Sequence, residues 1–187
     1  MHPLAQRLHD EHRRLTQVLG VLETQIDRLA RAEDVDFDLM LDAMTYITDF
    51  PNRLHHPVED VLFARLAAID PGAADACQAQ IAEHERLFHD SAAFYGLLEA
   101  VQIDDVTLMR DRLVGAGREF IAAQRAHLLR EEAELLPNAE RQISRADWDA
   151  AARTASAASD PLDATATPTR YQALYKAIAR VAGIQRT

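Results

Sequence analysis

Histidine and glutamate recur in this 187-residue chain at a fixed interval of 72 positions. Glu11-His12 is repeated as Glu83-His84, and two segments with the pattern His-x-x-x-Glu follow the same interval, from 55 to 127 and from 59 to 131. These two segments supply the residues His55, Glu59, His127 and Glu131. Imidazole nitrogens and carboxylate oxygens are common metal ligands. The repeat therefore predicts two related half-sites whose ligands converge on one point.

Apolar residues at alternating steps of three and four predict four long helices, with His12 and His84 in line with the apolar stripes. The expected ranges are about 3–31, a second helix after the acidic segment EDVDFD that ends near 69, a third after the turn at 70–72, and a fourth from 104 or 105 to about 137. Short connections between long helices favour an all-α fold, an up-down-up-down four-helix bundle in residues 1–140.

Two prolines interrupt the second of these helices. Proline removes a backbone hydrogen bond and crowds the preceding turn, so Pro51 and Pro57 should kink or break this helix close to His55.

Residues 141–187 are expected to form a short C-terminal helical extension. Ser144 is suited to cap a short helix, and a loop rich in Ser, Thr, Asp and Pro follows it. A last helix, about Thr169 to Ala182, has one apolar face. That face should pack on the bundle, where it could close one end, or on a partner, which allows a homodimer through this helix.

Composition excludes several classes of protein. The net charge of −10 argues against a nucleic-acid surface, which needs clustered Lys and Arg. Cys77 is the only cysteine, so an intrachain disulfide and a thiolate metal cluster are both excluded. The N-terminus lacks a signal-peptide core, and no apolar run approaches the ~20 residues of a membrane span. We expect a cytoplasmic protein.

The number of candidate ligands indicates the chemistry. Four imidazoles and two carboxylates are too many for one tetrahedral zinc site, and they suffice for two six-coordinate metals only if Glu59 and Glu131 bridge them. Coordination positions would then stay open for an exogenous molecule. Ligands of this mixed kind suit iron, with manganese or zinc as weaker candidates. The hypothesis is a centre of two non-haem iron ions with a bridging oxygen species, able to bind dioxygen.

Simpler interpretations of single residues stay open. One His-x-x-x-Glu pair is expected by chance, and paired His⁺ and Glu⁻ could occupy a core without metal. A further pair of this spacing, His56 and Asp60, lies about 100° around the helix from the first. The counterpart of His56 is Leu128, so the repeat does not extend to it. His56 could therefore support a ligand, line a pocket or lie at the surface.

Other histidines and acids lie beside the pattern. Three histidines fall off the apolar stripes and are expected at the surface: His2, His9 and His89. Three glutamates are exposed by default, or could orient a ligand imidazole through its second nitrogen: Glu11, Glu83 and Glu132. Phe88 and Tyr95 continue the stripe of His84 and are expected in the core or at the wall of an oxygen pocket.

The segments LHDEHRRL, YITDFPNRLHHPVEDVLF, IAEHERL and QRAHLLREEAELLP together resemble the hemerythrin-like, or HHE cation-binding, domain family. The resemblance covers residues from about 3 to 140, and the tail DWDAAARTASAASDPL resembles the extension of bacterial single-domain members. It implies a four-helix bundle with a non-haem di-iron centre, whose ligands would be His12, His55, Glu59, His84, His127 and Glu131.

One position departs from the oxygen carriers of that family. They have a second histidine one turn after the ligand of the third helix, and this chain has Phe88 there. The resemblance therefore favours a sensor, scavenger or store of dioxygen or a related diatomic molecule over a bulk carrier. The rivals are a di-iron enzyme that consumes peroxide or nitric oxide, and an interaction module stabilised by metal.

Overall fold

The computed structural model describes residues 1–101, 106–154, 160–162 and 169–181. These residues form helices and no strand, which confirms the all-α class. Most of them lie in four long helical rods, which are α1 (Pro3–Ala30), the run α2 (Phe37–Phe50), η1 (Pro51–His55) and α3 (His56–Ile69), α4 (Ala74–Val101), and the run α5 (Val106–Arg130), η2 (Glu131–Leu135) and α6 (Leu136–Gln142). The predicted start of the fourth helix at 104 or 105 lies outside the described residues.

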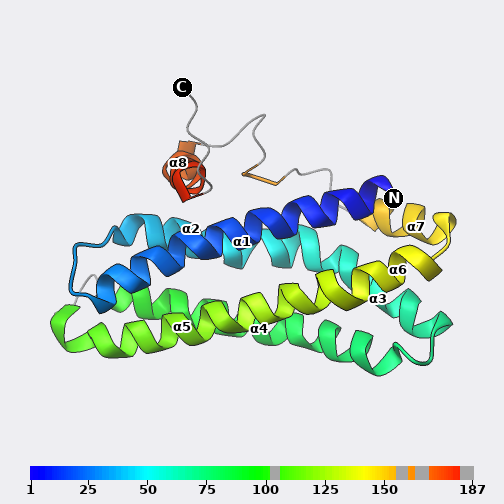
Figure 1. The fold of residues 1–187 in the computed structure, drawn as a ribbon, viewed down its shortest axis with the longest axis horizontal. Helices are drawn as coiled ribbons and strands as arrows, with labels where there is room; N and C mark the ends of the chain where they lie inside the picture. Colours follow the sequence, from blue (N-terminus) through cyan, green and yellow to red (C-terminus); the bar gives the residue numbers. More distant parts are fainter. Residues whose placement is uncertain (102–105, 155–159, 163–168, 182–187) are drawn as a thin grey trace.

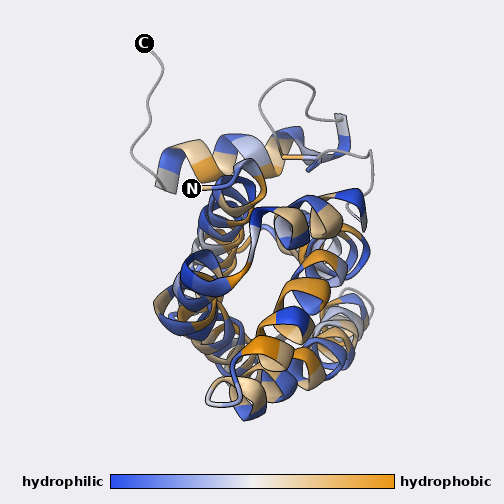
Figure 2. Cartoon of the chain, turned by 90° about the vertical axis from the view of Figure 1, so that its right-hand side faces the viewer, coloured by the Kyte–Doolittle hydropathy of each residue, from blue (hydrophilic) through white to orange (hydrophobic). Residues whose placement is uncertain are grey.

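The four rods lie lengthwise beside one another (Figure 1), and the end-on view in Figure 2 shows them around a common axis. α1 packs against α2 and α5, and α4 packs against α2, α3 and α5. Gly117 permits a close approach of α5 to α1, because a Cβ there would lie 2.5 Å from Cδ1 of Ile26. No helix within the described ranges is both long enough and apolar enough to cross a membrane.

Two of the rods contain a π-helical turn. η1 begins at Pro51, whose ring cannot donate the backbone hydrogen bond of a regular helix. The predicted interruption of the second helix is therefore present, and it ends at His55. The second π-helical turn, η2, begins at Glu131 and was not predicted. Such turns are often found at functional sites.

The apolar core is divided into two clusters along the bundle. α1 contributes Leu15 and Leu19 to the first cluster and Leu4 and Leu8 to the second. His12 lies between them in sequence. Burial of one leucine side chain contributes roughly 1.5–3 kcal/mol, so each cluster stabilises its own end of the bundle. The layer between them can therefore be polar.

The C-terminal extension packs on the outside of the rods. α7 (Arg145–Thr154) follows Ser144, whose hydroxyl accepts a hydrogen bond from the Asp147 amide at 3.2 Å, and it packs on α3. η3 (Thr169–Tyr171) leads into α8 (Gln172–Val181), which packs on α1 and α2 and is seen nearly end-on above them in Figure 1. The predicted end of this helix at residue 182 lies outside the described residues.

A buried carboxylate joins the extension to the bundle. Asp160 is 7% exposed, forms an ion pair with Arg14 and accepts a hydrogen bond from the Tyr46 hydroxyl at 3.1 Å. Leu174 and Ile178 of α8 are buried against the first apolar cluster. The apolar face of α8 is thus covered by the chain itself.

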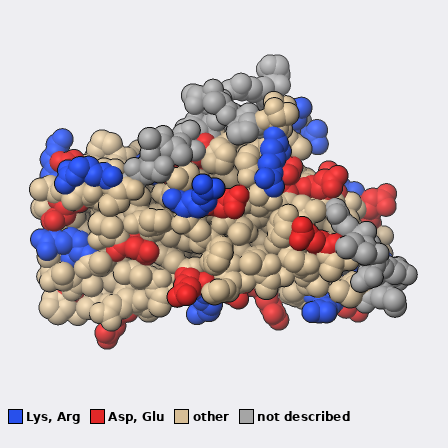
Figure 3. Space-filling view, turned by 180° about the vertical axis from the view of Figure 1, so that it is seen from behind, with Lys and Arg blue, Asp and Glu red and all other residues tan. Residues whose placement is uncertain are grey.

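Charged side chains of both signs are interspersed on the face shown in Figure 3. Lys and Arg form no continuous patch among the described residues of that face, in keeping with the overall excess of acidic residues.

Candidate metal centre

The six predicted ligands lie in one buried layer between the two apolar clusters. None of them is more than 5% exposed. They come from every rod: α1 supplies His12, η1 and α3 supply His55 and Glu59, α4 supplies His84, and α5 and η2 supply His127 and Glu131. The structure therefore brings the whole predicted set together.

The first half-site consists of His12, His55 and Glu59. The Nε2 atoms of the two histidines lie 2.8 Å apart. Oε1 of Glu59 lies 3.1 Å from Nε2 of His12 and 3.2 Å from Nε2 of His55. Two nitrogens that bind one ion at about 2.1 Å and at right angles are about 3.0 Å apart. The spacing of these donor atoms therefore fits a single cation.

The second half-site consists of His84, His127 and Glu131. Nε2 of each histidine lies 3.3 Å from Oε1 of Glu131. A further histidine, His56, belongs to this group, because its ring and those of His84 and His127 offer donor atoms within 4.8 Å of one another.

Each of the two inner carboxylates faces both half-sites. Glu59 turns Oε1 to the first half-site, and its Oε2 lies 3.8 Å from Nε2 of His84 in the second. Glu131 turns Oε1 to the second half-site, and its Oε2 lies 3.4 Å from Nε2 of His12 in the first. Both glutamates thus lie between the half-sites. The shorter contacts of Glu59 are with the first half-site, and the shorter contacts of Glu131 are with the second.

A second set of carboxylates faces the outer nitrogens of the four imidazoles. The Nδ1–carboxylate distances are 2.7 Å for His12–Glu132, 2.8 Å for His55–Glu11, 2.7 Å for His84–Asp60 and 3.4 Å for His127–Glu83. All four pairs obey the interval of 72 positions. A carboxylate at Nδ1 holds a proton there and leaves Nε2 free to bind a metal. These acids orient the imidazoles, the second of the two roles that the sequence left open for Glu11, Glu83 and Glu132.

Arginine side chains form ion pairs with two of these outer carboxylates, Glu11 and Glu83. Arg7 donates to Glu11 at 2.7 Å. Arg86 and Arg130 both form ion pairs with Glu83. The repeat gave no signal for Arg7 or Arg130, whose equivalents are Ala79 and Val58, whereas Arg86 is matched by Arg14.

Gln80 is a site residue that the sequence did not reveal. It is 2% exposed, and its Nε2 lies 2.7 Å from Nδ1 of His127. Nε of Arg130 donates to Oε1 of Gln80 at 3.1 Å, which turns the amide nitrogen toward the imidazole. The residue at the equivalent position of the first half is Leu8, so the repeat gave no signal for an amide here.

Burial opposes protonation of every imidazole in the layer, but carboxylates outweigh it for three of them. The pKa of His12 is raised to about 10, and the pKa values of His55 and His84 are each raised to about 9. For His127 burial prevails and lowers the pKa to about 4. Burial also opposes ionisation of Glu59, but nearby histidines hold the pKa of its carboxyl well below the usual range. A bound cation would replace the protons on these imidazoles.

Several buried polar atoms of the layer have no hydrogen-bond partner among the described residues. They are Oε2 of Glu59, Oε2 of Glu131, Nε2 of His127 and Nδ1 of His56. A buried polar atom without a partner is costly, and a native protein rarely keeps four of them in one place. The donor types and their spacing fit metal ions in this layer.

Three expectations about neighbouring residues were wrong. His2 is half-buried instead of a surface residue, because its Nε2 lies 3.1 Å from Asp149 and its ring stacks on Trp148 with centroids 5.6 Å apart. Phe88 is 42% exposed instead of buried in the core, because Leu87 takes the inward position after His84. His9 is half-buried instead of a free surface residue, since its ring nitrogens lie 2.8 Å from Glu132 and 2.9 Å from Glu140. His56 is buried, with its pKa lowered well below the usual value by burial, which excludes the surface role left open for it.

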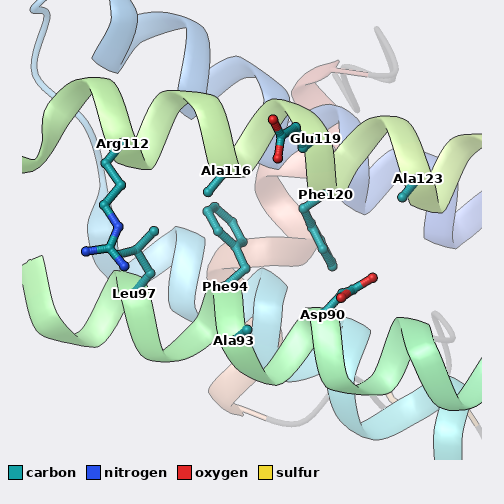
Figure 4. A pocket seen from close by; sticks show the side chains of 9 residues that line it. All are labelled: Asp90, Ala93, Phe94, Leu97, Arg112, Ala116, Glu119, Phe120 and Ala123. Atoms are coloured by element: carbon teal, nitrogen blue, oxygen red, sulfur yellow. The ribbon is translucent and has the colours of Figure 1, made fainter.

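A groove of about 450 Å³ lies elsewhere, between α4 and α5 (Figure 4). Phe94 and Phe120 stack in it with ring centroids 5.4 Å apart, and Asp90, Arg112 and Glu119 lie at its rim. None of the six predicted ligands lines this groove, so it is not a cleft of the candidate centre.

Comparison with known proteins agrees with the geometry. The family model described as "Hemerythrin HHE cation binding domain" matches residues 4–139. Neither a curated protein nor a solved structure gives a significant match to the chain.

Proposed function

We propose, since the chain belongs to the hemerythrin HHE cation-binding family, that it is a non-haem di-iron protein that binds dioxygen or a related small diatomic molecule. Its role would be that of a sensor, scavenger or store. The observation that carries the proposal is that Glu59 and Glu131 each turn one oxygen toward each half-site. Two carboxylates shared between two groups of imidazoles favour two metal ions over one.

The residues divide between the two ions. His12 and His55 would hold one ion, His84 and His127 would hold the other, and the two shared glutamates would contact both. Imidazole and carboxylate donors without thiolate suit iron, and the only cysteine, Cys77, lies in the second apolar cluster. When bound, the two irons would supply electrons and open coordination positions for a diatomic ligand.

The surrounding residues prepare this centre. The outer carboxylates keep a proton on Nδ1 of His12, His55 and His84 and direct Nε2 inward. The apolar clusters on both sides keep bulk water from the layer, and a low local dielectric strengthens every charge interaction inside it. Phenylalanine at position 88 supports a role other than bulk transport, because this position holds a histidine in the oxygen carriers that the sequence resembles.

The proposal extends to the fold and the setting of the protein. We assign the four rods to an up-down-up-down four-helix bundle, in agreement with the neighbour contacts of α1 and α4. A cytoplasmic location and function without nucleic acid or membrane stay predictions.

Anaerobic reconstitution with Fe²⁺ followed by oxygen titration tests the function. We expect two iron ions per chain and a visible absorption band that appears with oxygen and disappears when oxygen is removed. A ratio far below two would contradict the di-iron centre. Rapid irreversible oxidation would contradict the carrier and store roles, and sustained turnover of peroxide or nitric oxide with a reductant would select the enzymatic rival.

The effect of metal on thermal stability provides an independent readout. Binding to the folded state alone stabilises a protein by about 2.7 kcal/mol when free metal is at 100 times Kd. We therefore expect the melting temperature to rise on addition of Fe²⁺ under anaerobic conditions. The same addition should leave a Glu59→Gln variant almost unchanged.

A further inference from the structure

We propose that His56 is a fifth imidazole donor of the metal centre, so that the second half-site has three imidazoles and the first has two. The inference rests on the proposed function and makes it more specific. It assigns a role to a residue outside the six predicted ligands and outside the 72-residue repeat.

The position of the His56 ring carries the proposal. His56 is 8% exposed, and its ring lies parallel to that of His84, with centroids 3.9 Å apart and an interplanar angle of 4°. The ring of His127 meets it edge to face at 5.7 Å. Each of the three histidines offers a ring nitrogen within 4.8 Å of those of the other two. Three imidazole nitrogens at this spacing can bind one cation.

The hydrogen bonds of His56 distinguish it from a core histidine. Its Nδ1 is buried without a partner among the described residues. The other four imidazoles of the layer each have a carboxylate near Nδ1. A buried histidine in a purely structural role would be expected to hydrogen-bond, so this ring keeps at least one nitrogen free for a metal ion.

The backbone explains how two adjacent histidines can serve one layer. Consecutive residues of a regular α-helix point about 100° apart. His55 instead ends the π-helical turn η1, with φ −100° and ψ −65°, and His56 begins α3. The equivalent pair, His127 and Leu128, lies within the regular helix α5. The third imidazole of the second half-site thus comes from the residue that follows a π-helical turn, at a position where the repeat has Leu128 in a regular helix.

His56 would supply the imidazole that the oxygen carriers of the family have at the position of Phe88. Phe88, one turn after His84, cannot bind a metal, and its side chain is 42% exposed. His56 approaches the ring of His84 from a different rod. The two metal positions would then have unlike donor sets, three imidazoles at one and two at the other.

Two substitutions separate metal binding from packing. His56→Phe keeps an aromatic ring against His84 without a nitrogen, and His56→Leu copies the equivalent Leu128. Anaerobic Fe²⁺ titration against a competing chelator should show two ions per wild-type chain. Both variants should lose at least tenfold in affinity for one ion and keep the other. His89→Phe, at an exposed histidine, should bind as the wild type does.

A measurement on the wild-type protein covers the case in which the variants fail to fold. With ¹⁵N-labelled histidine and Zn²⁺ as a diamagnetic probe, five of the eight histidines should show the ring ¹⁵N shift of a metal-bound nitrogen. Four such signals, or wild-type affinity in His56→Phe with two ions bound, would overturn the role of His56 alone. Fewer than two ions in the wild type would overturn the di-iron proposal and this inference with it.

Discussion

Each half-site consists of two histidines and one glutamate, but the two have different surroundings. In the first, Glu11 lies 2.8 Å from Nδ1 of His55, and the pKa of that imidazole is raised to about 9. In the second, Glu83 lies 3.4 Å from Nδ1 of His127, and burial lowers the pKa of that imidazole to about 4. The repeat thus preserves the ligands more strictly than the groups that orient them.

The backbone also departs from the repeat. η1 covers 51–55, whereas the equivalent residues 123–127 belong to the regular helix α5. The other π-helical turn, 131–135, has its equivalent at 59–63, inside α3. Each half-site therefore has a π-helical turn at a place where the other has none. The difference teaches that a duplicated set of candidate ligands can form two half-sites that are chemically unlike.

The largest expected effect comes from the residues that the two halves share. Glu59→Gln removes a carboxylate that faces both half-sites, so we expect iron content to fall below one ion per chain. Metal analysis after anaerobic reconstitution measures this. Glu134→Gln, an exposed change three residues after Glu131, serves as the control. Retention of one tightly bound ion would show that Glu59 belongs to a single half-site.

A change confined to one half should remove one ion. His84→Ala takes an imidazole from the second half-site and leaves His12 and His55 in place, so iron content should fall from two ions to about one. His12→Ala should do the same for the first half-site. Metal analysis of both variants checks the division, and unchanged content in either would remove that histidine from the ligand set.

The orienting carboxylates should have intermediate effects. Loss of a group that orients a metal ligand typically costs 10–100-fold in metal affinity. Glu11→Gln should approach the upper part of this range because its contact with His55 is short, and Glu83→Gln should lie in the lower part. Chelator competition measures both. Equal effects would mean that the difference between 2.8 and 3.4 Å has no consequence for binding.

The smallest effect is expected where the second half is made to resemble the first. Gln80→Leu copies Leu8 and removes an amide that donates to Nδ1 of His127, a bond that favours the proton on Nε2. Without it Nδ1 can carry the proton and face Glu83, so affinity for one ion should rise by less than about tenfold. A fall in affinity in the same titration would show instead that Gln80 supports the ligand.

The sequence predicted the inner site because its signal is periodic. His12 and His84 fall on apolar stripes, and the repeat supplies the other ligands, so ordinary helix geometry is enough to place them. The same repeat contained the correction for Phe88, since Leu15 and Leu87 are equivalent and both are buried. The expectation for Phe88 failed because a step of four was chosen where the helix uses a step of three.

The roles of His56 and Gln80 could not be predicted from the repeat. His56 directly follows a π-helical turn, and proline predicts an interruption of the helix without specifying its form. Gln80 occupies a position whose equivalent is apolar, and an amide in a helix has no special spacing. Both residues became recognisable only from their contacts with His84 and His127.

The division of the apolar core by a polar layer has a consequence for motion. Each end of the bundle has its own apolar cluster. Without bound cations the layer between them contains ion pairs of imidazoles with carboxylates, but it also keeps buried polar atoms that have no partner among the described residues, which makes it the less stable part. The two ends should then open independently, with amide hydrogen exchange of the turns around His12 and His84 faster than that of either cluster. Metal ions that bind residues from all four rods would join the two ends into one cooperative unit, and exchange along the whole bundle would slow together.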